Sequence, residues 1–180
     1  MVLVSAALDL LAEDGADAVS LRAVARRAGV SAMAPYRHYP DKESLLAAVA
    51  ARGFDGLTHA LRAADEAAAA GQALVAQAVA YVRYASENPA LFRLMFGPKR
   101  VGSHADLAAA GEAAYRVLAT RIAAETPSDA DREPRTLACW SMVHGLAMLI
   151  LDGRIGDGST ATTDNVTRRV AAAMLGSARP

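Results

Sequence analysis

The chain has few residues that could support covalent or metal chemistry. Cys139 is the only cysteine among 180 residues, so an intramolecular disulfide is impossible and a reducing compartment is expected. The four histidines, His38, His59, His104 and His144, are scattered along the chain without the spacing typical of metal ligands. We therefore expect no metal site.

Patterns typical of enzymes are missing as well. Cys139 and His144 are five residues apart, which on a helix turns them to different faces, so they do not form a nucleophile–base pair. None of the usual glycine-rich phosphate-binding loops occurs. These absences argue against an enzyme and against a bound cofactor.

The chain also lacks net charge, a charged leader and a long apolar run. Its 19 basic residues balance its 19 acidic residues, so the overall charge does not indicate nucleic acid. Residues 1–7 are uncharged, so we expect no signal peptide. The most apolar stretch, residues 137–151, contains His144 and Gly145 and is expected to be too short for a membrane span. Together these features predict a cytoplasmic protein that has no membrane partner.

The residues that are abundant favour helix. Apolar residues make up 53% of the chain and aromatic residues only 5%, and long segments mix Ala, Leu and Val with Arg, Asp and Glu. Apolar spacing and local stop signals predict helices at 2–13, 21–28, 32–39, 41–57, 72–87, 90–96, 107–125, 135–151 and 164–175. Gly97 and Pro98 are expected to end the sixth of these, and residues 63–71 to hold a loop or a helix end. We expect an all-α fold with a small head and a larger body.

Charge is concentrated in one short region. Between residues 20 and 42 the chain has five basic residues and one acidic residue, Asp41, and an acidic flank precedes them. The basic residues are Arg22, Arg26, Arg27, Arg37 and Lys42. Such a patch on a neutral protein is a plausible contact surface for phosphates, although an ordinary solvated face has the same composition.

The same region has the spacing of a helix-turn-helix. Ser20 and Ser31 are expected to cap two short helices that meet at the turn Gly29-Val30-Ser31, with Val30 filling the angle between them. Asp41 is expected to cap the next helix. The second short helix would protrude, and its first residues could reach base edges in a major groove of DNA. For Tyr39 we favour a packing role in the head.

The run LRAVARRAGVS at residues 21–31, followed by PYRHYPDKESLL at residues 35–46, closely resembles the tetracycline-repressor (TetR) family of regulators. The resemblance implies a DNA-binding head at residues 1–48 and a ligand-binding and dimerisation domain at residues 49–180. It also implies that Tyr36, His38 and Lys42 contact DNA phosphates. For Lys42, the charge adds to the exposed N–H groups of a helix start, which makes an anion site.

Base reading is expected from the remaining exposed residues of the motif. Arg37 can reach a guanine edge, and Arg22 can touch the DNA backbone or a base. Ala32, Met33 and Ala34 stand where more polar residues are often found, and they can only touch thymine methyls or permit close approach. Direct reading would then rest on Ser31, Arg37 and Arg22, with DNA shape supplying the rest. The predicted DNA-binding residues are Arg22, Ser31, Ala32, Met33, Tyr36, Arg37, His38 and Lys42.

The body shows a second resemblance. The segments WSMVHG at residues 140–145 and PALFRLMFGP at residues 89–98 resemble a C-terminal ligand-binding and dimerisation domain named for its Trp, His and Gly. Aromatic and Met side chains with a few polar tips suit an apolar or aromatic small molecule, although each alone could be plain core. The predicted effector-binding residues are Tyr81, Tyr84, Phe92, Met95, Phe96, Tyr115, Trp140 and His144, with Met142 and Met148 as further candidates.

The last two helices are the expected dimer interface. The helix at 135–151 is apolar on most sides, which predicts that it is buried, and in a body this small one side should face another subunit. Gly145 would let another backbone come close. The alternative is that both helices pack inside a monomer. Two further alternatives to a ligand-responsive repressor are an enzyme and a helical small-molecule-binding or interaction module that does not bind DNA.

Overall fold

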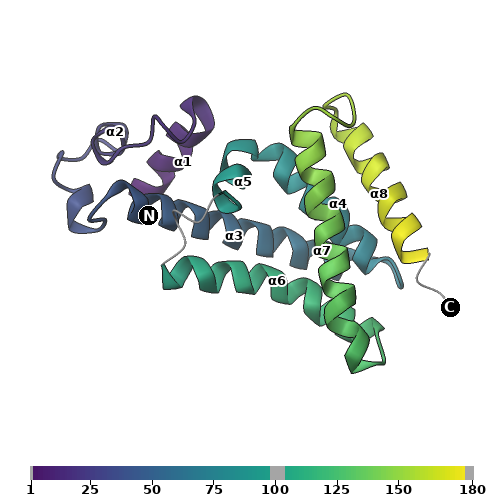
Figure 1. Cartoon of the computed structure of the whole chain (residues 1–180). Coiled ribbons are helices and arrows are strands. Elements are labelled where there is room, and N and C mark those ends of the chain that lie inside the picture. The colour runs from purple at the N-terminus through teal and green to yellow at the C-terminus, as the bar shows by residue number, and fades with distance from the viewer. Residues whose placement is uncertain (1, 98–103, 177–180) are drawn as a thin grey trace. The chain divides into compact units, whose positions relative to one another are not determined.

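The computed structural model describes residues 2–97 and 104–176, which fold into helices joined by short turns (Figure 1). In these ranges the elements are α1 (Val2–Asp14), α2 (Leu21–Arg27), the 3-10 helix η1 (Pro35–Arg37), α3 (Lys42–Ala67), α4 (Ala73–Glu87), α5 (Pro89–Met95), α6 (Ala105–Glu125), α7 (Asp129–Leu151) and α8 (Thr160–Gly176). The all-α prediction is confirmed. Pro98, predicted to help end a helix, lies outside the described residues.

The chain packs into two compact units. The first consists of Met1–Asp55 and Asn88–Glu112, and the second of Gly56–Glu87 and Ala113–Pro180. α3 and α6 each contribute one end to the first unit and the other end to the second. Every residue of the predicted head belongs to the first unit, and the predicted domain boundary after residue 48 stays a prediction.

The first unit is built around a buried apolar cluster. Its members are Ala6, Ala7, Leu10, Leu11, Val19, Leu21, Val24, Leu45 and Val49. α1 contacts α2 and α5, and α2 contacts η1. Tyr39 packs against this cluster, and burial raises the pKa of its hydroxyl. The packing role predicted for Tyr39 is therefore confirmed.

Two polar side chains cap helices of the first unit as predicted. Ser20 precedes α2, and its Oγ accepts a hydrogen bond from the N–H of Ala23 at 3.1 Å. Asp41 precedes α3, and its Oδ1 accepts from the N–H of Ser44 at 2.7 Å. Each cap satisfies a backbone donor that has no partner inside its helix.

Gly29 ends α2 as the sequence predicts, but Val30 does not behave as expected. Gly29 adopts φ +67°, and the N–H groups of Gly29 and Val30 donate to the carbonyls of Arg26 and Ala25 at 3.2 and 3.0 Å. This pair of bonds requires the left-handed conformation that glycine adopts without strain. The Val30 side chain is 39% exposed, so the prediction that it fills the angle between the helices is wrong. Its backbone closes the turn, and its side chain points outward.

The helix predicted at 32–39 is shorter and tighter than expected. Residues 32–34 form a turn, and η1 covers only Pro35–Arg37. Pro35 has no N–H for the carbonyl of Ser31, which accepts from the N–H of Ala34 at 2.9 Å instead. The N–H of His38 then bonds three residues back to the carbonyl of Pro35 at 3.0 Å, the 3-10 pattern. The predicted Ser31 cap is wrong, because no α-helix begins after it.

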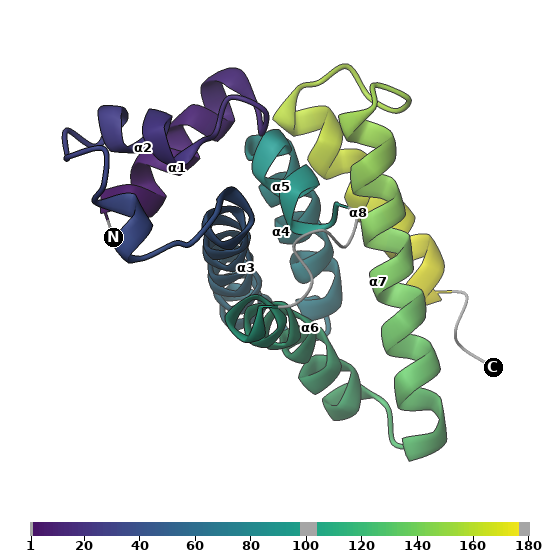
Figure 2. The ribbon, with the colours of Figure 1, turned by 60° about the vertical axis from the view of Figure 1, so that its left-hand side comes forward.

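In the second unit α4, α7 and α8 lie side by side (Figures 1 and 2). A buried cluster of Leu74, Ile122 and Cys139 is covered by Leu118, Met174 and Leu175. Asp65 of α3 accepts hydrogen bonds from Nε and Nη2 of Arg121 on α6 at 2.7 and 2.6 Å, and from Gln77 of α4 at 2.7 Å. One carboxylate therefore ties three helices of this unit together.

Three helices, α3, α7 and α8, extend well beyond their predicted bounds, each by a full turn or more. α3 continues to Ala67 through a stretch expected to hold a loop or helix end, because alanine favours helix more than any other residue. α8 begins at Thr160 rather than at residue 164, since Ser159 Oγ accepts the N–H of Thr162 at 3.2 Å and starts the helix earlier. α7 begins at Asp129 rather than near residue 135, with two acidic residues in its first turn, where they favour a helix start.

The longer α7 changes two expectations. By length and composition alone it could cross a membrane, so the prediction that this stretch is too short is wrong, although the core helix of a globular protein passes the same test. α7 is also not buried on all sides. Leu137 and Leu149 are 43% and 45% exposed, whereas Val143 and Ala147 are buried. The helix is buried along one face, and its other face is open in this chain.

Candidate nucleic-acid interface and effector residues

The segment after α2 presents its side chains to solvent. Met33 is 64% exposed and Tyr36 is 42% exposed. Further exposed members of the predicted set are Ser31, Ala32, Arg37 and His38. Pro35 is buried and anchors the segment to the interior of the unit. This arrangement leaves the predicted reading side chains outside the head, as contact with a DNA groove requires.

Lys42, the first residue of α3, is half-buried and already has a protein partner. Its Nζ donates to the backbone carbonyl of Asp17 at 3.3 Å. The neighbouring Asp41 carboxylate accepts hydrogen bonds from the N–H and hydroxyl of Ser44, and these bonds lower the pKa of Asp41. An ionised carboxylate therefore occupies this helix start. An anion site here would depend on the Lys42 ammonium more than on free N–H groups.

The basic patch is smaller than the sequence suggests. Arg27 donates two hydrogen bonds to Glu13 at 2.9 and 2.5 Å, which lowers the pKa of Glu13 and raises that of Arg27. Arg22, Arg26 and Arg37 are exposed, and within the described ranges none of them forms an ion pair. Three arginines are thus open to DNA, while Arg27 is held by Glu13.

Three predicted effector residues form a hydrogen-bonded chain in the second unit. Tyr81 Oη lies 2.9 Å from Nδ1 of His144, and the side chain of Trp140 also bonds to Tyr81. An indole N–H can only donate, so the Tyr81 oxygen accepts from Trp140 and can donate its own proton to His144. Burial raises the pKa of Tyr81 and lowers the pKa of His144. A neutral imidazole with an unprotonated Nδ1 agrees with both shifts.

Two more predicted effector residues lie in the same unit. The ring of Tyr115 packs edge-on against Trp140, with 5.7 Å between ring centroids. Tyr84 packs against α3, where its hydroxyl oxygen lies only 2.7 Å from the position that a Cβ on Gly56 would occupy. Glycine at position 56 is therefore needed for this close approach. Trp140 remains 37% exposed, so the chain of polar groups is reachable from solvent.

The other three predicted effector residues belong to the first unit. Phe92 and Met95 are buried, and Phe96 packs 4.8 Å from Phe92 and 5.2 Å from Phe54, measured between ring centroids. No spacing in the sequence marks Phe54 as a partner of Phe96. A Cβ on Gly53 would stand 2.6 Å from Sδ of Met95, so this cluster packs tightly. The predicted set thus divides into two groups, one in each unit.

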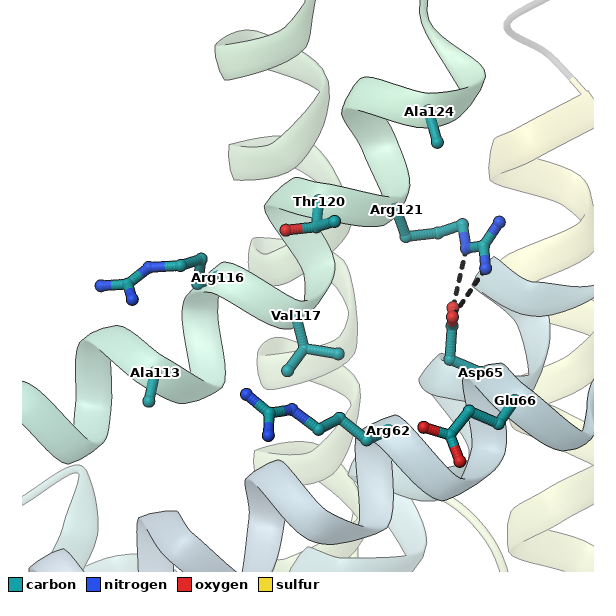
Figure 3. Close-up of a pocket in the computed structure, with 9 residues that line it drawn as sticks. All are labelled: Arg62, Asp65, Glu66, Ala113, Arg116, Val117, Thr120, Arg121 and Ala124. Atoms are coloured by element: carbon teal, nitrogen blue, oxygen red, sulfur yellow. Dashed lines mark hydrogen bonds and ion pairs between the residues drawn. The ribbon is translucent and has the colours of Figure 1, made fainter.

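The structure also shows a groove that the sequence analysis missed. It has a volume of about 400 Å³ and lies between α3 and α6 within the second unit (Figure 3). Its lining consists of Arg62, Asp65, Glu66, Ala113, Arg116, Val117, Thr120, Arg121 and Ala124. The residues come from two helices far apart in sequence, so no local pattern could have revealed it. Among the described residues, no group of three or more His, Cys, Asp or Glu side chains could hold a metal ion.

One face of α7 is open over several turns. Leu137, Ser141, Gly145 and Leu149 follow one another at intervals of four residues, and all four are exposed. A Cβ added to Gly145 would meet nothing within 4 Å. The close approach predicted at Gly145 is therefore not made by this chain itself.

Two family models match the chain. The model for bacterial regulatory proteins of the tetR family matches residues 3–49, and the model for the tetracyclin repressor-like C-terminal domain matches residues 74–174. The second match contains Trp140, His144 and Gly145 and covers more than half of the chain. The chain belongs to the TetR family of bacterial transcriptional regulators. It has a DNA-binding N-terminal domain and is not an enzyme, and the alternative of a helical module that does not bind DNA is set aside.

Individual relatives agree with this assignment. The chain is 28% identical to an uncharacterized HTH-type transcriptional regulator of Mycobacterium tuberculosis, covering 96% of this chain and 79% of that protein. It is 33% identical to a protein with unknown function from Rhodococcus sp. RHA1, with a TM-score of 0.77 and coverage of 94% and 91%. The TetR family transcriptional regulator PfmR from Thermus thermophilus shares the fold, with a TM-score of 0.63, 23% identity and 99% coverage of both chains.

Proposed function

We propose that this regulator is a homodimeric repressor that binds a near-palindromic operator and is released from it by an apolar or aromatic small molecule. The observation that carries the DNA-reading part is the exposed segment from Ser31 to His38, which is anchored by buried Pro35. A bacterial operator lies in the cytoplasm, and we place the protein there. The apolar face of α7 is then an interface with a second subunit and not a membrane contact.

In this proposal the DNA-contacting residues divide into two groups. Arg37, Ser31 and Arg22 read base edges, and the apolar tip of Ala32 and Met33 contacts thymine methyls. Tyr36, His38 and Lys42 hold DNA phosphates and fix the position of the head on the duplex. Lys42 would exchange its bond to a backbone carbonyl for a bond to a phosphate oxygen.

The open face of α7 supports dimerisation through α7 and α8. Gly145, at the middle of this face, has open space around it, so a second helix can approach its backbone closely. A two-fold axis at this face pairs it with its own copy, as an isologous interface requires. The resulting dimer would present two identical heads, and the operator would repeat the same half-site on both strands.

The chain of Tyr81, His144 and Trp140 supports an effector site in the C-terminal domain. The group offers aromatic surface, one polar cluster and partial access to solvent, which suits an apolar molecule with a hydrogen-bonding group. An effector can release DNA only if it binds the DNA-incompetent dimer more tightly than the DNA-bound form.

Binding to DNA upstream of the protein's own gene tests the proposal. A gel shift followed by footprinting should show protection of a near-palindrome whose half-sites lie about 10 base pairs apart, or a multiple of that spacing. Apolar and aromatic compounds are then screened for any change in DNA affinity, and loss of the shift is expected. Protection of a single asymmetric half-site would contradict the dimeric mode, and tighter binding in the presence of every active compound would contradict release.

A confirmed effector allows a test of its site. Trp140→Ala removes the indole from the proposed site and should weaken the response. Arg154→Ala, an exposed residue in the turn after α7, is the control and should respond as the wild type does. An unchanged response of Trp140→Ala would remove Trp140 from the site.

A further inference from the structure

Gln77 of α4 carries a buried oxygen that has no hydrogen-bond partner. The residue is only 3% exposed, and within the described residues no group donates to its Oε1. A buried amide oxygen gives up its bonds to water when the chain folds, and leaving it unpaired costs free energy that native structures generally avoid. This oxygen therefore calls for a hydrogen-bond donor.

The contact with Asp65 determines which end of the amide is open. Gln77 Nε2 donates to Oδ1 of Asp65 at 2.7 Å. The same carboxylate accepts two hydrogen bonds from Arg121, drawn as dashed lines in Figure 3, and the Arg121 bond is the largest cause that lowers the pKa of Asp65. An ionised carboxylate can only accept, so the NH2 group of Gln77 must face Asp65 and the oxygen must face away from it.

The open oxygen belongs to a residue beside the cluster proposed as the effector site. Tyr81 follows Gln77 by four residues, so the two buried side chains are neighbours on one face of α4. The Tyr81 hydroxyl is already bonded to both His144 and Trp140. Gln77 Oε1 is thus an acceptor next to this cluster that no protein group of the described chain satisfies, and the exposed edge of the cluster at Trp140 gives access from solvent.

We propose that Gln77 Oε1 accepts a hydrogen bond from the effector, which is a neutral molecule with a hydroxyl or amide N–H on an aromatic body. The inference rests on the effector site proposed above and names the chemistry of its ligand. An anionic group would face the lone pairs of Oε1 near the Asp65 carboxylate. A cationic group would find the charge of Asp65 already neutralised by Arg121, so its burial would cost hydration without an ion pair in return.

Isothermal titration of the full chain, without DNA, tests the chemistry of the ligand with three probes at pH 7.5. The probes are 2-naphthol, its methyl ether 2-methoxynaphthalene, and 2-naphthoate. They share one aromatic body, but only 2-naphthol is a neutral donor. The wild type should bind 2-naphthol about tenfold more tightly than the ether, the difference expected when one buried acceptor gains its hydrogen bond, and should bind 2-naphthoate more weakly than the ether.

Two variants test whether Gln77 causes this preference. Gln77→Leu removes the acceptor and should bind 2-naphthol and its ether with equal affinity. Gln72→Leu makes the same replacement at an exposed glutamine just before α4 and should keep the tenfold preference. Circular dichroism melting checks that both variants fold, because Gln77→Leu also loses the bond to Asp65. Should Gln77→Leu fail to fold, the comparison of the three probes on the wild type decides.

Several results would overturn the proposal. They are the absence of saturable 2-naphthol binding, equal affinity of the wild type for 2-naphthol and its ether, tighter binding of 2-naphthoate, and a preference that persists in Gln77→Leu. An ordered water that permanently satisfies Oε1 would give the second of these results. If 2-naphthol binds as expected but does not release operator DNA, the proposed release mechanism fails and the role of Gln77 stands.

Discussion

The hydroxyl of Tyr81 on α4 lies 2.9 Å from Nδ1 of His144 on α7 and is also bonded by the side chain of Trp140, one turn earlier on the same helix. A single oxygen therefore joins two helices through two hydrogen bonds. In the neutral tautomer that carries its proton on Nε2, Nδ1 of His144 accepts from the phenol while the phenol oxygen accepts from the indole N–H.

Tyr81→Phe should lower the free energy of unfolding by about 1–3 kcal/mol. The substitution keeps the ring but removes the oxygen, so it leaves the indole N–H and the imidazole Nδ1 without this partner in a partly buried site. Urea denaturation at pH 7.5 measures the loss. Tyr115→Phe is the matched control, since within the described residues the Tyr115 hydroxyl has no hydrogen bond. Equal losses in both variants would contradict a role for the Tyr81 hydroxyl.

Stability should decrease as the pH falls from 7.5 to 5.5. Burial lowers the pKa of His144 in the folded state, so the unfolded chain takes up this proton first. The contribution of neutral His144 to the free energy of unfolding is complete above the unfolded-state pKa of about 6.5, and it is lost as the pH falls below that value. The pKa values of Asp65 and Asp41 are also lowered in the folded state. Their contributions to stability are lost only below about pH 4, so they do not affect this pH range. Urea denaturation at several pH values should show that the free energy of unfolding of His144→Gln depends less on pH than that of the wild type. An unchanged pH dependence would mean that another group causes it.

Arg37→Ala and Lys42→Ala should affect DNA binding differently. Loss of a base contact by Arg37→Ala should cost about 1–3 kcal/mol per half-site on the true operator and relax preference at one base pair. Loss of a phosphate contact by Lys42→Ala should weaken binding to all sequences and reduce the salt slope by roughly one unit per contact. Binding to operator and scrambled DNA across a salt series measures both.

These two variants need one check each. Lys42 also bonds to the carbonyl of Asp17, so Lys42→Ala could lower stability. The melting temperature of the Lys42→Ala variant must therefore be compared with that of the wild type before the DNA result is interpreted. If Arg37→Ala weakens binding to both DNAs equally, Arg37 is a phosphate contact, and base reading falls to Ser31, Arg22 and DNA shape.

Met33 should recognise a thymine methyl. Replacing each operator thymine in turn by uracil removes only that methyl, and at one position per half-site the wild type should lose affinity by a factor of about 3–10, the effect of burying one or two fewer methyl-sized groups. Met33→Ala should bind both DNAs with similar affinity at that position. If the variant remains as sensitive to uracil as the wild type, another residue contacts the methyl.

Gly145→Leu should weaken dimerisation without unfolding the subunit. Nothing in this chain lies within 4 Å of the new side chain, and leucine favours helix over glycine by roughly 0.8 kcal/mol, so the fold of each subunit is preserved. A leucine at the middle of the proposed interface should raise the dimer dissociation constant by about a hundredfold or more, as overpacking of about 3 kcal/mol implies. Sedimentation of the wild type, Gly145→Ala and Gly145→Leu measures this, and a monomeric wild type at micromolar concentration would reject the interface.

Features that depend on neighbouring residues could be predicted from the sequence. Ser20, Gly29 and Asp41 act through bonds to residues three or four positions away, so their types and spacing were sufficient to place three helix ends. The same locality explains why the segment between residues 31 and 42 could be matched to the motif of the TetR family before its geometry was known.

Features that depend on the balance of several weak preferences could not be predicted. The predicted helix start at residue 135 is wrong: α7 begins at Asp129 and includes Pro134, because the acidic first turn outweighs the loss of one hydrogen bond. Pro35 tightened the reading segment into a 3-10 turn, and Val30 turned outward once its N–H was committed to Ala25. The groove between α3 and α6 depends on two helices meeting, and no pattern within either helix indicates it.

The exposed apolar tip formed by Ala32 and Met33 has a consequence for modified DNA. A surface without hydrogen-bonding side chains distinguishes pyrimidines by their C5 substituent, and 5-methylcytosine carries the same methyl group as thymine at the edge of the major groove. Enzymatic methylation of a cytosine could then create a contact where the unmodified base offers none. Under the proposed mode of reading, this regulator would respond to the methylation state of its operator as well as to its sequence.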